Sequence, residues 1–355
     1  MTLSQAPTTE EYVGSTFQGP GRPHLVESQP LPQTLEAGEY LVKIGLSTIC
    51  GSDLHTYVGR RSAPTPCILG HEAMGTVVAV GPGSPESYLQ KRVTWTLSAS
   101  CGQCPPCQDW GLPQKCEKLV KYGHAPLTTD AMMNGCFASH LRLLKGTSVV
   151  TLPDNVSDAL AAPANCALAT MMSVVEALPK GTTSVLIQGA GLLGLYGILL
   201  LQDLGCPTIT IVDLDPERLA LAKTFGATHT YLPDQLPPKG DYDAAVEVAG
   251  IASIVPEGLQ RLRVGGTYIL AGLVHPQSKL DLTGQQIIQK SITLKGIHNY
   301  APRHLEKAID FLHRFEAKPL LENLVSPPYP LEGIDEAFDL AQSKRWLRVS
   351  LRSIS

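Results

Sequence analysis

The segment SVLIQGAGLLGLYGILLLQDLG, residues 184–205, is the strongest local indication of the fold. An apolar run ends in the glycine-rich motif GAGLLG, and a second apolar run follows it directly. The segment is near the length that spans a membrane, but its spaced glycines and the early Gln188 fit a buried strand followed by a buried helix. We therefore expect this stretch to open a nucleotide-binding fold rather than to cross a membrane.

The motif GAGLLG has the form G-x-G-x-x-G, which is weak evidence alone and stronger between a strand and a helix. Gly189 allows the tight turn, Gly191 lets the backbone approach a pyrophosphate, and Gly194 allows the helix to pack closely on the strand. The helix N-terminus adds free N–H groups and the positive end of the helix dipole. The predicted cofactor-binding residues of this turn are Gly189, Gly191, Leu192, Leu193 and Gly194.

A carboxylate, Asp213, stands in the next strand-like run, TITIVDLD. An acidic side chain about 20 residues after the glycine motif hydrogen-bonds the adenosine ribose and repels a 2′-phosphate. We therefore predict NAD in preference to NADP. Because the motif lies in the middle of the chain, FAD is a weaker alternative. The remaining alternative is glycine-rich packing without a nucleotide.

Strand-like and helix-like segments alternate around this motif. A helix-like segment at 165–179 comes first, and strands are expected within 183–189, 208–215, 228–232, 242–250 and 265–273, with helices at 190–205, 216–227 and 251–262. Such alternation predicts βαβ units and a parallel α/β sheet, the Rossmann arrangement.

The two ends of the chain have a different pattern. Short β-type runs at 39–48, 75–81 and 91–97 are separated by clusters of Gly and Pro, which predicts a β-rich domain with long loops. An amphipathic helix is expected at 303–315 and a final strand within 347–353.

Composition narrows the class of protein. The chain has 355 residues, 43% apolar and 17% charged, which is typical of globular domains and not of disordered chains. A formal net charge of −4 without a basic run argues against nucleic acid as a partner. The start MTLSQAPTTEEYVG lacks the basic and apolar regions of a secretory signal. Nine cysteines without an export signal then predict a reducing, cytoplasmic location.

Four cysteines lie together in CGQCPPCQDWGLPQKC, residues 101–116. In a reducing compartment such a cluster is more often a set of metal ligands than a pair of disulfides. The spacing C-x2-C-x2-C also begins iron–sulfur ligation runs, so an iron–sulfur cluster is the alternative to zinc. Four thiolates around zinc close a tetrahedral site and leave no position for a substrate.

Two further motifs are CGSDLHTY at 50–57 and GHEAMG at 70–75. Both precede the four-cysteine loop and the glycine-rich motif in the chain. Cys50, the pair His71–Glu72, the four-cysteine loop and the mid-chain GAGLLG resemble the zinc-dependent medium-chain alcohol dehydrogenases over nearly the whole chain. The resemblance implies a GroES-like β-rich catalytic domain at 1–164 and 298–355, with a structural-zinc lobe at about 98–120. It implies an inserted Rossmann domain at 165–297, two zinc ions per chain, NAD, and a homodimer or homotetramer.

The resemblance also implies roles for single residues. The structural zinc would be held by Cys101, Cys104, Cys107 and Cys116. Cys50 and His71 match two ligands of a catalytic zinc, a Lewis acid on the alcohol oxygen, and Glu72 matches a neighbour or exchanging fourth ligand. For the third ligand, AAPANCALAT at 161–170 resembles the cinnamyl-alcohol branch and points to Cys166. Relatives with an acidic third ligand place it just before a proline, where this chain has Ala162, which cannot bind zinc.

Other matches concern the proton and the cofactor. Ser52 and His55 match a proton relay, since an imidazole titrates near the operating pH; the alternative for His55 is an exposed turn residue. Arg218 matches a basic residue near the adenosine ribose, and Arg348 matches an arginine on the pyrophosphate. The alternative for both arginines is a solvated surface charge.

For the substrate, the strings TYVGRRSAPTPCILGHE, GLPQKCEKLVKYGH and AAPANCALAT together resemble a subgroup of alcohol dehydrogenases associated with phosphonate catabolism. This implies a substrate such as 2-hydroxyethylphosphonate or its aldehyde, whose dianion requires cations beside the zinc pocket. The candidates are Arg60, Arg61, Lys121 and His124. The alternatives are solvated surface charges, a polyol or threonine-type dehydrogenase with an uncharged or zwitterionic substrate, and a non-catalytic protein on the same fold.

Overall fold

The computed structural model describes residues 11–127, 133–238 and 240–353. The chain forms two compact units, residues 1–166 with 301–355, and residues 167–300. Residues 1–10, in which no export signal is expected, lie outside the described part. The domain boundaries expected from the sequence, 1–164 with 298–355 and 165–297, stay a proposal.

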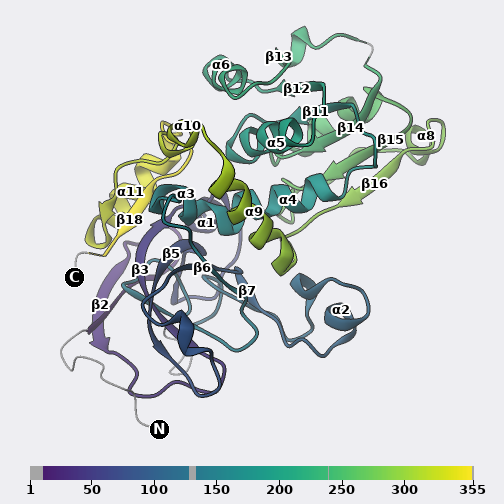
Figure 1. Cartoon of the computed structure of the whole chain (residues 1–355). Coiled ribbons are helices and arrows are strands. Elements are labelled where there is room, and N and C mark those ends of the chain that lie inside the picture. Colours follow the sequence, from purple (N-terminus) through teal and green to yellow (C-terminus); the bar gives the residue numbers. More distant parts are fainter. Residues whose placement is uncertain (1–10, 128–132, 239, 354–355) are drawn as a thin grey trace. The chain divides into compact units, whose positions relative to one another are not determined.

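The unit of residues 167–300 is built on a six-stranded parallel sheet (Figure 1). Its strands are β11 (Ser184–Gln188), β12 (Thr208–Val212), β13 (His229–Tyr231), β14 (Tyr242–Glu247), β15 (Leu262–Leu270) and β16 (Thr293–Gly296). They lie in the order β13-β12-β11-β14-β15-β16, so that the chain winds outward from β11 first in one direction and then in the other. This is the doubly wound order of dinucleotide-binding folds, and it confirms the predicted α/β class.

The helices of this unit are α4 (Ala169–Glu176), α5 (Leu192–Asp203), α6 (Pro216–Thr224), α7 (Val255–Gln260) and α8 (Gly284–Ile288). The apolar stretch that opened the sequence analysis forms the buried strand β11 and the largely buried helix α5. Gly194 permits this packing, because a Cβ atom there would lie 2.0 Å from the carbonyl oxygen of Gly189. Helix α6 begins at a cap in which the Asp215 carboxylate accepts the N–H of Glu217 at 2.9 Å.

The other unit is β-rich, as predicted. Its largest sheet joins β10, β6, β5, β3, β18 and β17 in that order, with β9 also paired to β3. The bounds are β3 (Tyr40–Thr48), β5 (Glu72–Val80), β6 (Arg92–Trp95), β9 (His140–Leu143), β10 (Val149–Thr151), β17 (Tyr329–Pro330) and β18 (Ser350–Arg352). Because Ser350 pairs with Thr48, the C-terminal segment completes a sheet that begins near the N-terminus.

A smaller sheet and a hairpin complete this unit. β1 (Glu11–Phe17) pairs with β2 (Leu25–Pro30) and β4 (Cys67–Ile68), and β7 (Ser98–Ala99) pairs with β8 (Val120–Lys121). Its helices are α1 (Gly51–Tyr57), α2 (Pro105–Gln108), α3 (Asp158–Pro163), α9 (Pro302–Arg314), α10 (Lys318–Glu322) and α11 (Ile334–Gln342). The amphipathic helix expected at 303–315 is α9, whose buried side carries Leu305, Ala308, Ile309, Phe311 and Leu312.

One described helical stretch, Asp158–Glu176, is long and apolar enough to cross a membrane by length and composition. It has 19 residues with a mean hydropathy of 1.3, and 72% of it is buried inside the structure. Because the core helix of a globular protein has the same properties, this stretch is weak evidence for a membrane span.

Candidate metal centres and cofactor site

Two groups of described residues could hold a metal ion. One comprises Cys101, Cys104, Cys107 and Cys116, and the other comprises Cys50, His71, Glu72 and Cys166. Within each group, one ligand atom per residue lies within 4.8 Å of every other. These are the two sets proposed from the sequence, and their assignment as zinc ligands stays a prediction.

The four-cysteine group has the spacing of a tetrahedral thiolate site. The Sγ atom of Cys104 lies 3.5 Å from that of Cys107 and 3.8 Å from that of Cys116. Zinc–sulfur bonds of about 2.3 Å arranged tetrahedrally separate the sulfur atoms by about 3.8 Å, whereas a disulfide requires about 2.05 Å. The donor set therefore fits zinc, and all four cysteines are free thiols.

Backbone N–H groups of the same lobe point at these sulfur atoms. Cys116 Sγ accepts the N–H of Cys101 at 3.2 Å and that of Lys118 at 3.3 Å. The N–H of Gln103 reaches Cys101 Sγ at 3.4 Å and lowers the pKa of the Cys101 thiol to about 6. Such donors stabilise thiolates, the form that binds metal.

The second group is assembled from three separate segments. Cys50 precedes helix α1, His71 precedes strand β5, and Cys166 lies in a π-helical turn, Ala164–Leu168, that follows α3. Asp53 joins the first two, because its Oδ2 accepts the N–H of Cys50 at 2.9 Å and its Oδ1 lies 3.3 Å from His71 Nδ1. With Nδ1 held in this way, Nε2 of His71 is the nitrogen left for a metal.

The electrostatics of this group favour a cation. Burial alone lowers the pKa of His71, but Asp53 and the Cys50 thiol reverse the effect and raise the pKa to about 10. A hydrogen bond from Cys166 lowers the pKa of the Cys50 thiol, and the same bond together with burial raises the pKa of Cys166. A thiolate and an imidazole that attracts positive charge are a donor set suited to zinc.

Glu72 lies behind these ligands with its carboxylate fully engaged. Arg348 Nε donates to Oε2 at 2.7 Å, Arg348 NH2 donates to Oε1 at 3.0 Å, and Thr48 Oγ1 donates to Oε2 at 2.7 Å. Burial raises the pKa of Glu72 to about 7, although Arg348 opposes the shift. The structure thus shows that Arg348 binds a carboxylate, which the sequence did not indicate. The predicted contact of Arg348 with a pyrophosphate stays a prediction.

The predicted relay residues lie on helix α1. Ser52 Oγ is 3.4 Å from His71 Nε2, so the hydroxyl stands at the second metal group. His55 lies in the last turn of the helix and is half-buried, and its carbonyl accepts the N–H of Arg61 at 3.0 Å. The transfer of a proton between the two side chains stays a prediction.

One of the four anion candidates, His124, lies beside the second metal group, and the charges of Lys121 and Arg61 act on it. The ring of His124 lies 5.3 Å from that of His71. Burial lowers the pKa of Lys121, and Arg61 adds to the effect, while Cys166, Cys50 and Asp53 oppose it. Burial and the charges of Lys121, His71 and Arg61 likewise lower the pKa of His124. The fourth candidate, Arg60, is exposed.

The segment that carries Lys121 and His124 is firmly anchored. The buried Tyr122 donates its backbone N–H to Leu97 at 3.1 Å, and its hydroxyl accepts the N–H of Leu144 at 2.9 Å. Gly123 has a φ of +72°, and a Cβ atom there would lie 2.4 Å from the carbonyl oxygen of Gly70. Glycine at 123 therefore lets this segment cross the backbone next to His71.

The glycine-rich turn of the other unit has the features expected of a pyrophosphate cradle. A Cβ atom at Gly191, the residue before α5, would meet nothing within 4 Å, so the space above the helix N-terminus is open. Asp213 accepts the N–H of Ala190 at 2.6 Å, which holds its carboxylate beside this turn. Arg218 lies 3.7 Å from Asp215 and is a quarter exposed. The roles predicted for the glycines, Leu192, Leu193, Asp213 and Arg218 stay predictions.

Sequence reasoning missed several residues of these sites. Asp53 lies three residues after the predicted ligand Cys50, Asn165 lies directly before Cys166, and both side chains touch the backbone or ring of His71. Glu247 ends strand β14 and accepts the backbone N–H groups of Gly250 and Gly272, which joins two loops at the carboxyl edge of the parallel sheet. The proximity of Asp53 and Asn165 to ligands was the only signal in the sequence.

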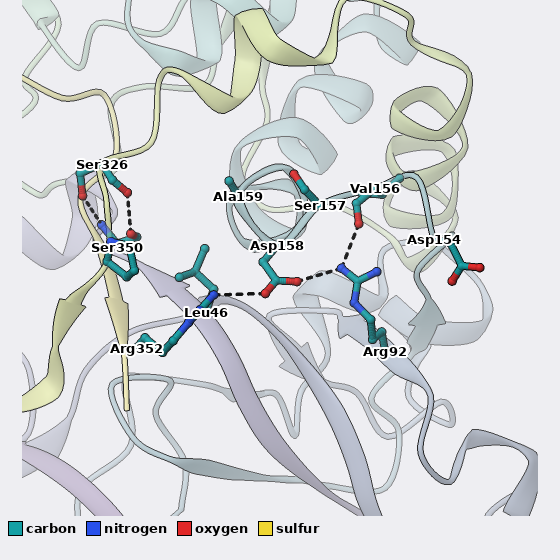
Figure 2. A pocket seen from close by; sticks show the side chains of 11 residues that line it. Leu46, Arg92, Asp154, Val156, Ser157, Asp158, Ala159, Ser326, Ser350 and Arg352 are labelled. Carbon is teal, nitrogen blue, oxygen red and sulfur yellow. Dashed lines mark hydrogen bonds and ion pairs between the residues drawn. The ribbon is translucent and has the colours of Figure 1, made fainter. Parts of the chain in front are cut away.

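A pocket of about 490 Å³ lies away from these ligands, at the start of α3 (Figure 2). There Asp158 accepts from Arg92 NH2 at 2.8 Å and from Arg352 NH2 at 3.3 Å. The lining residues come from the sheet, from the first turn of α3 and the loop before it, and from the segment 326–328, and they include none of the predicted site residues.

Both units of the chain match families of known proteins. Residues 36–154 match the family model described as the alcohol dehydrogenase GroES-like domain, and residues 193–314 match that of zinc-binding dehydrogenase. An L-threonine 3-dehydrogenase of Chelativorans sp. is 31% identical over 77% of this chain and 79% of that protein. A D-arabitol-phosphate dehydrogenase of Enterococcus avium is 30% identical over 88% and 89%. The solved alcohol dehydrogenase of Thermotoga maritima superposes with a TM-score of 0.87 at 26% identity, over 97% of this chain and 100% of that one.

Proposed function

The chain belongs to the zinc-dependent medium-chain alcohol dehydrogenases, and within that family we propose that it interconverts a small phosphonate-bearing alcohol and its aldehyde. It is an oxidoreductase that acts on CH–OH groups with zinc and a nicotinamide dinucleotide as cofactors. The substrate we propose is 2-hydroxyethylphosphonate or phosphonoacetaldehyde.

The observation that carries the substrate proposal is the group of cations beside the second metal cluster. Lys121 is the last residue of β8, His124 follows it in the anchored segment, and Arg61 comes from the loop after α1. Lys121 is half-buried, and its ammonium is close enough to the Cys50 and Cys166 thiols to feel their charge. Partial burial destabilises a lysine ammonium, and a dianionic substrate headgroup beside it would offset that cost.

A relative supports the same substrate class. The D-arabitol-phosphate dehydrogenase of E. avium is named for a substrate that carries a phosphoryl dianion. Phosphonates and phosphates present the same three oxygen acceptors, which Arg binds in a fork and Lys binds as a point charge.

We assign the metal ligands and the proton-transfer residues separate roles. Cys50, His71 and Cys166 would hold the catalytic zinc, with Glu72 and Arg348 behind them, and the four-cysteine lobe would hold a structural zinc. When bound, zinc supplies a Lewis acid for the alcohol oxygen and the nicotinamide supplies the hydride acceptor. Ser52 Oγ would take the alcohol proton, and His55 would pass it to water.

The cofactor proposal is NAD in preference to NADP. The Asp213 carboxylate is held beside the glycine-rich turn, where its charge would repel a 2′-phosphate and its free lone pairs would accept ribose hydroxyls. We also propose a homodimer or homotetramer, on the family resemblance, and a cytoplasmic location, on the cysteine content.

A second candidate is a threonine-type or polyol dehydrogenase. It is favoured by the L-threonine 3-dehydrogenase of Chelativorans sp., at 31% identity. The two candidates differ in the charge of the substrate, because the threonine zwitterion has no net charge and a phosphonate is a dianion.

The test follows NADH absorbance with zinc-replete protein on 2-hydroxyethylphosphonate, L-threonine and 1-propanol, each with NAD and with NADP. We expect a kcat/KM for the phosphonate at least tenfold above that for the neutral alcohol, and a preference for NAD. Turnover of L-threonine or 1-propanol without turnover of the phosphonate would keep the dehydrogenase and exclude the phosphonate substrate.

A further inference from the structure

Asn165 stands immediately before the third proposed metal ligand, and its side chain faces away from solvent with 0% exposure. We infer that Asn165 is a positioning residue, which fixes Cys166 against His71 and so sets the geometry of the catalytic metal centre. The inference rests on the proposed function, because it concerns the ligands of the proposed catalytic zinc.

Two hydrogen bonds carry the inference. Asn165 Nδ2 donates to the backbone carbonyl of His71 at 3.1 Å and to that of Trp95 at 3.1 Å. His71 stands just before β5, and Trp95 is the last residue of β6. One amide nitrogen with two hydrogens therefore joins the helical stretch that carries Cys166 to two strands of the large sheet.

The three ligands form a connected series through two polar side chains. Asp53 accepts the N–H of Cys50 and lies 3.3 Å from the His71 imidazole, and Asn165 donates to the carbonyl of His71 and is bonded covalently to Cys166. His71 is the member common to both connections. Removal of the Asn165 amide would leave Cys166 attached to this series only through its hydrogen bond with the Cys50 thiol and through the packing of its helix.

The local backbone explains why such a connection is needed. Cys166 lies in the π-helical turn 164–168, directly after Pro163, which cannot donate a helical hydrogen bond. A π turn displaces side chains from their α-helical directions and is frequent at functional sites. The start of the same helical stretch is held separately, since Arg92 and Arg352 both bind Asp158 (Figure 2). The first turn is thus fixed by ion pairs, and the turn with Cys166 by Asn165.

The test compares the wild-type protein with Asn165→Leu, which keeps the approximate volume and removes both donors. Asn165→Ser, which keeps one hydroxyl donor, is the second variant in case the first does not fold. Asn155→Leu is the matched control, because it removes an exposed Asn-to-backbone bond, from Asn155 Nδ2 to the His313 carbonyl. The readouts are the metal content per chain, Co²⁺ affinity and the visible Co²⁺ spectrum of the catalytic site, and kcat/KM.

Loss of a residue that orients metal ligands typically weakens metal binding by roughly 10- to 100-fold. We expect Asn165→Leu to lose Co²⁺ affinity by that factor at the catalytic site, to show altered d–d bands, and to keep the metal of the four-cysteine lobe. Asn165→Ser should lie between Asn165→Leu and wild type, and Asn155→Leu should match wild type.

The outcomes separate this inference from the proposed function. If both folded Asn165 variants bind Co²⁺ with wild-type affinity and spectrum while their melting temperatures fall, Asn165 is only structural and the inference is wrong. If the wild-type protein itself binds a single metal per chain, at the four-cysteine lobe, the proposed catalytic centre is wrong and the inference is wrong with it.

Discussion

The imidazole ring of His124 lies against that of His71, with the ring centroids 5.3 Å apart and the ring planes tilted by 37°. His71 is a proposed metal ligand, and His124 follows the strand β8 that leaves the four-cysteine lobe. The contact brings the end of the lobe to the proposed catalytic centre. Lys121 belongs to the same segment, and its charge interacts with those of Cys50, Cys166 and Asp53.

The first prediction concerns that charge. Lys121→Met keeps the length and apolar stem of the side chain and removes the ammonium. A charge-assisted hydrogen bond contributes about 1.5–3 kcal/mol, so kcat/KM for 2-hydroxyethylphosphonate should fall roughly 10- to 100-fold while that for 1-propanol changes little. Steady-state kinetics on both alcohols checks this. Lys118→Met, at an exposed lysine of the same lobe, is the control. Equal losses on the two alcohols would place Lys121 outside the substrate site.

The second prediction concerns the two metal groups. The purified wild-type protein should hold two zinc ions per chain, Cys104→Ser should lose the structural one, and Cys50→Ala should lose the catalytic one. Only Cys50→Ala should abolish activity while leaving the melting temperature nearly unchanged, because the four-cysteine site closes on itself and serves stability. Elemental analysis measures the zinc content per chain, and thermal unfolding measures the melting temperature. Full activity of Cys50→Ala would show that the zinc mechanism is wrong.

The third prediction concerns cofactor choice. Asp213→Asn keeps an oxygen that can accept the N–H of Ala190 and removes the negative charge. The ratio of kcat/KM for NAD to that for NADP should therefore fall about 10- to 100-fold, which corresponds to about 1.4–2.8 kcal/mol. Kinetics with both cofactors at one alcohol concentration measures the ratio. An unchanged ratio of the two kcat/KM values would mean that another group distinguishes the 2′-hydroxyl of NAD from the 2′-phosphate of NADP.

The fourth prediction concerns pH and stability. His24 stacks on Tyr57 with centroids 5.8 Å apart and on Phe338 at 5.3 Å, and its Nδ1 lies 2.6 Å from Asp335. Burial lowers the pKa of His24, and Asp335 opposes the shift only partly. A base whose pKa is lower in the folded state stabilises the fold above its unfolded pKa of about 6.5, and this contribution is lost as the pH falls below that value.

The stability difference between wild type and His24→Asn should therefore depend on pH. We expect about 2 kcal/mol at pH near 8, from lost burial and stacking, and a smaller difference at pH values below about 6. Urea unfolding across this range measures it, with the exposed His229→Asn as control. A difference that grows on acidification would mean that the ion pair with Asp335 outweighs burial.

The local patterns of the sequence predicted most of the fold. The strand–glycine–helix order of residues 184–205 predicted β11 and α5, because apolar runs of those lengths and glycines at that spacing have few other arrangements. The edge strand β16 was not expected, since all four of its residues are exposed and its sequence has no apolar alternation. The two groups of metal-ligand candidates were also named from the sequence: the four-cysteine group from its spacing, and the second group from the resemblance to a known family.

Contacts between distant segments could not be predicted in the same way. That Arg348 would bind Glu72, 276 residues away, depends on β18 pairing with β3 beside β5. Asn165 and Asp53 carry no motif of their own, and their importance is visible only from the backbone and ring atoms that they touch.

Local periodicity and spacing were enough to predict the doubly wound sheet and the residue types able to bind metal, and the order of the motifs indicated the family. The side chains that meet at the proposed catalytic centre became known from the three-dimensional structure. There His124 lies on His71, the charges of Lys121 and Arg61 act on His124, Arg60 is exposed, and Asn165 and Asp53 have their connecting roles. Such contacts follow from sheet order and from the close approach that glycines such as Gly123 permit, and neither is a property of a short segment.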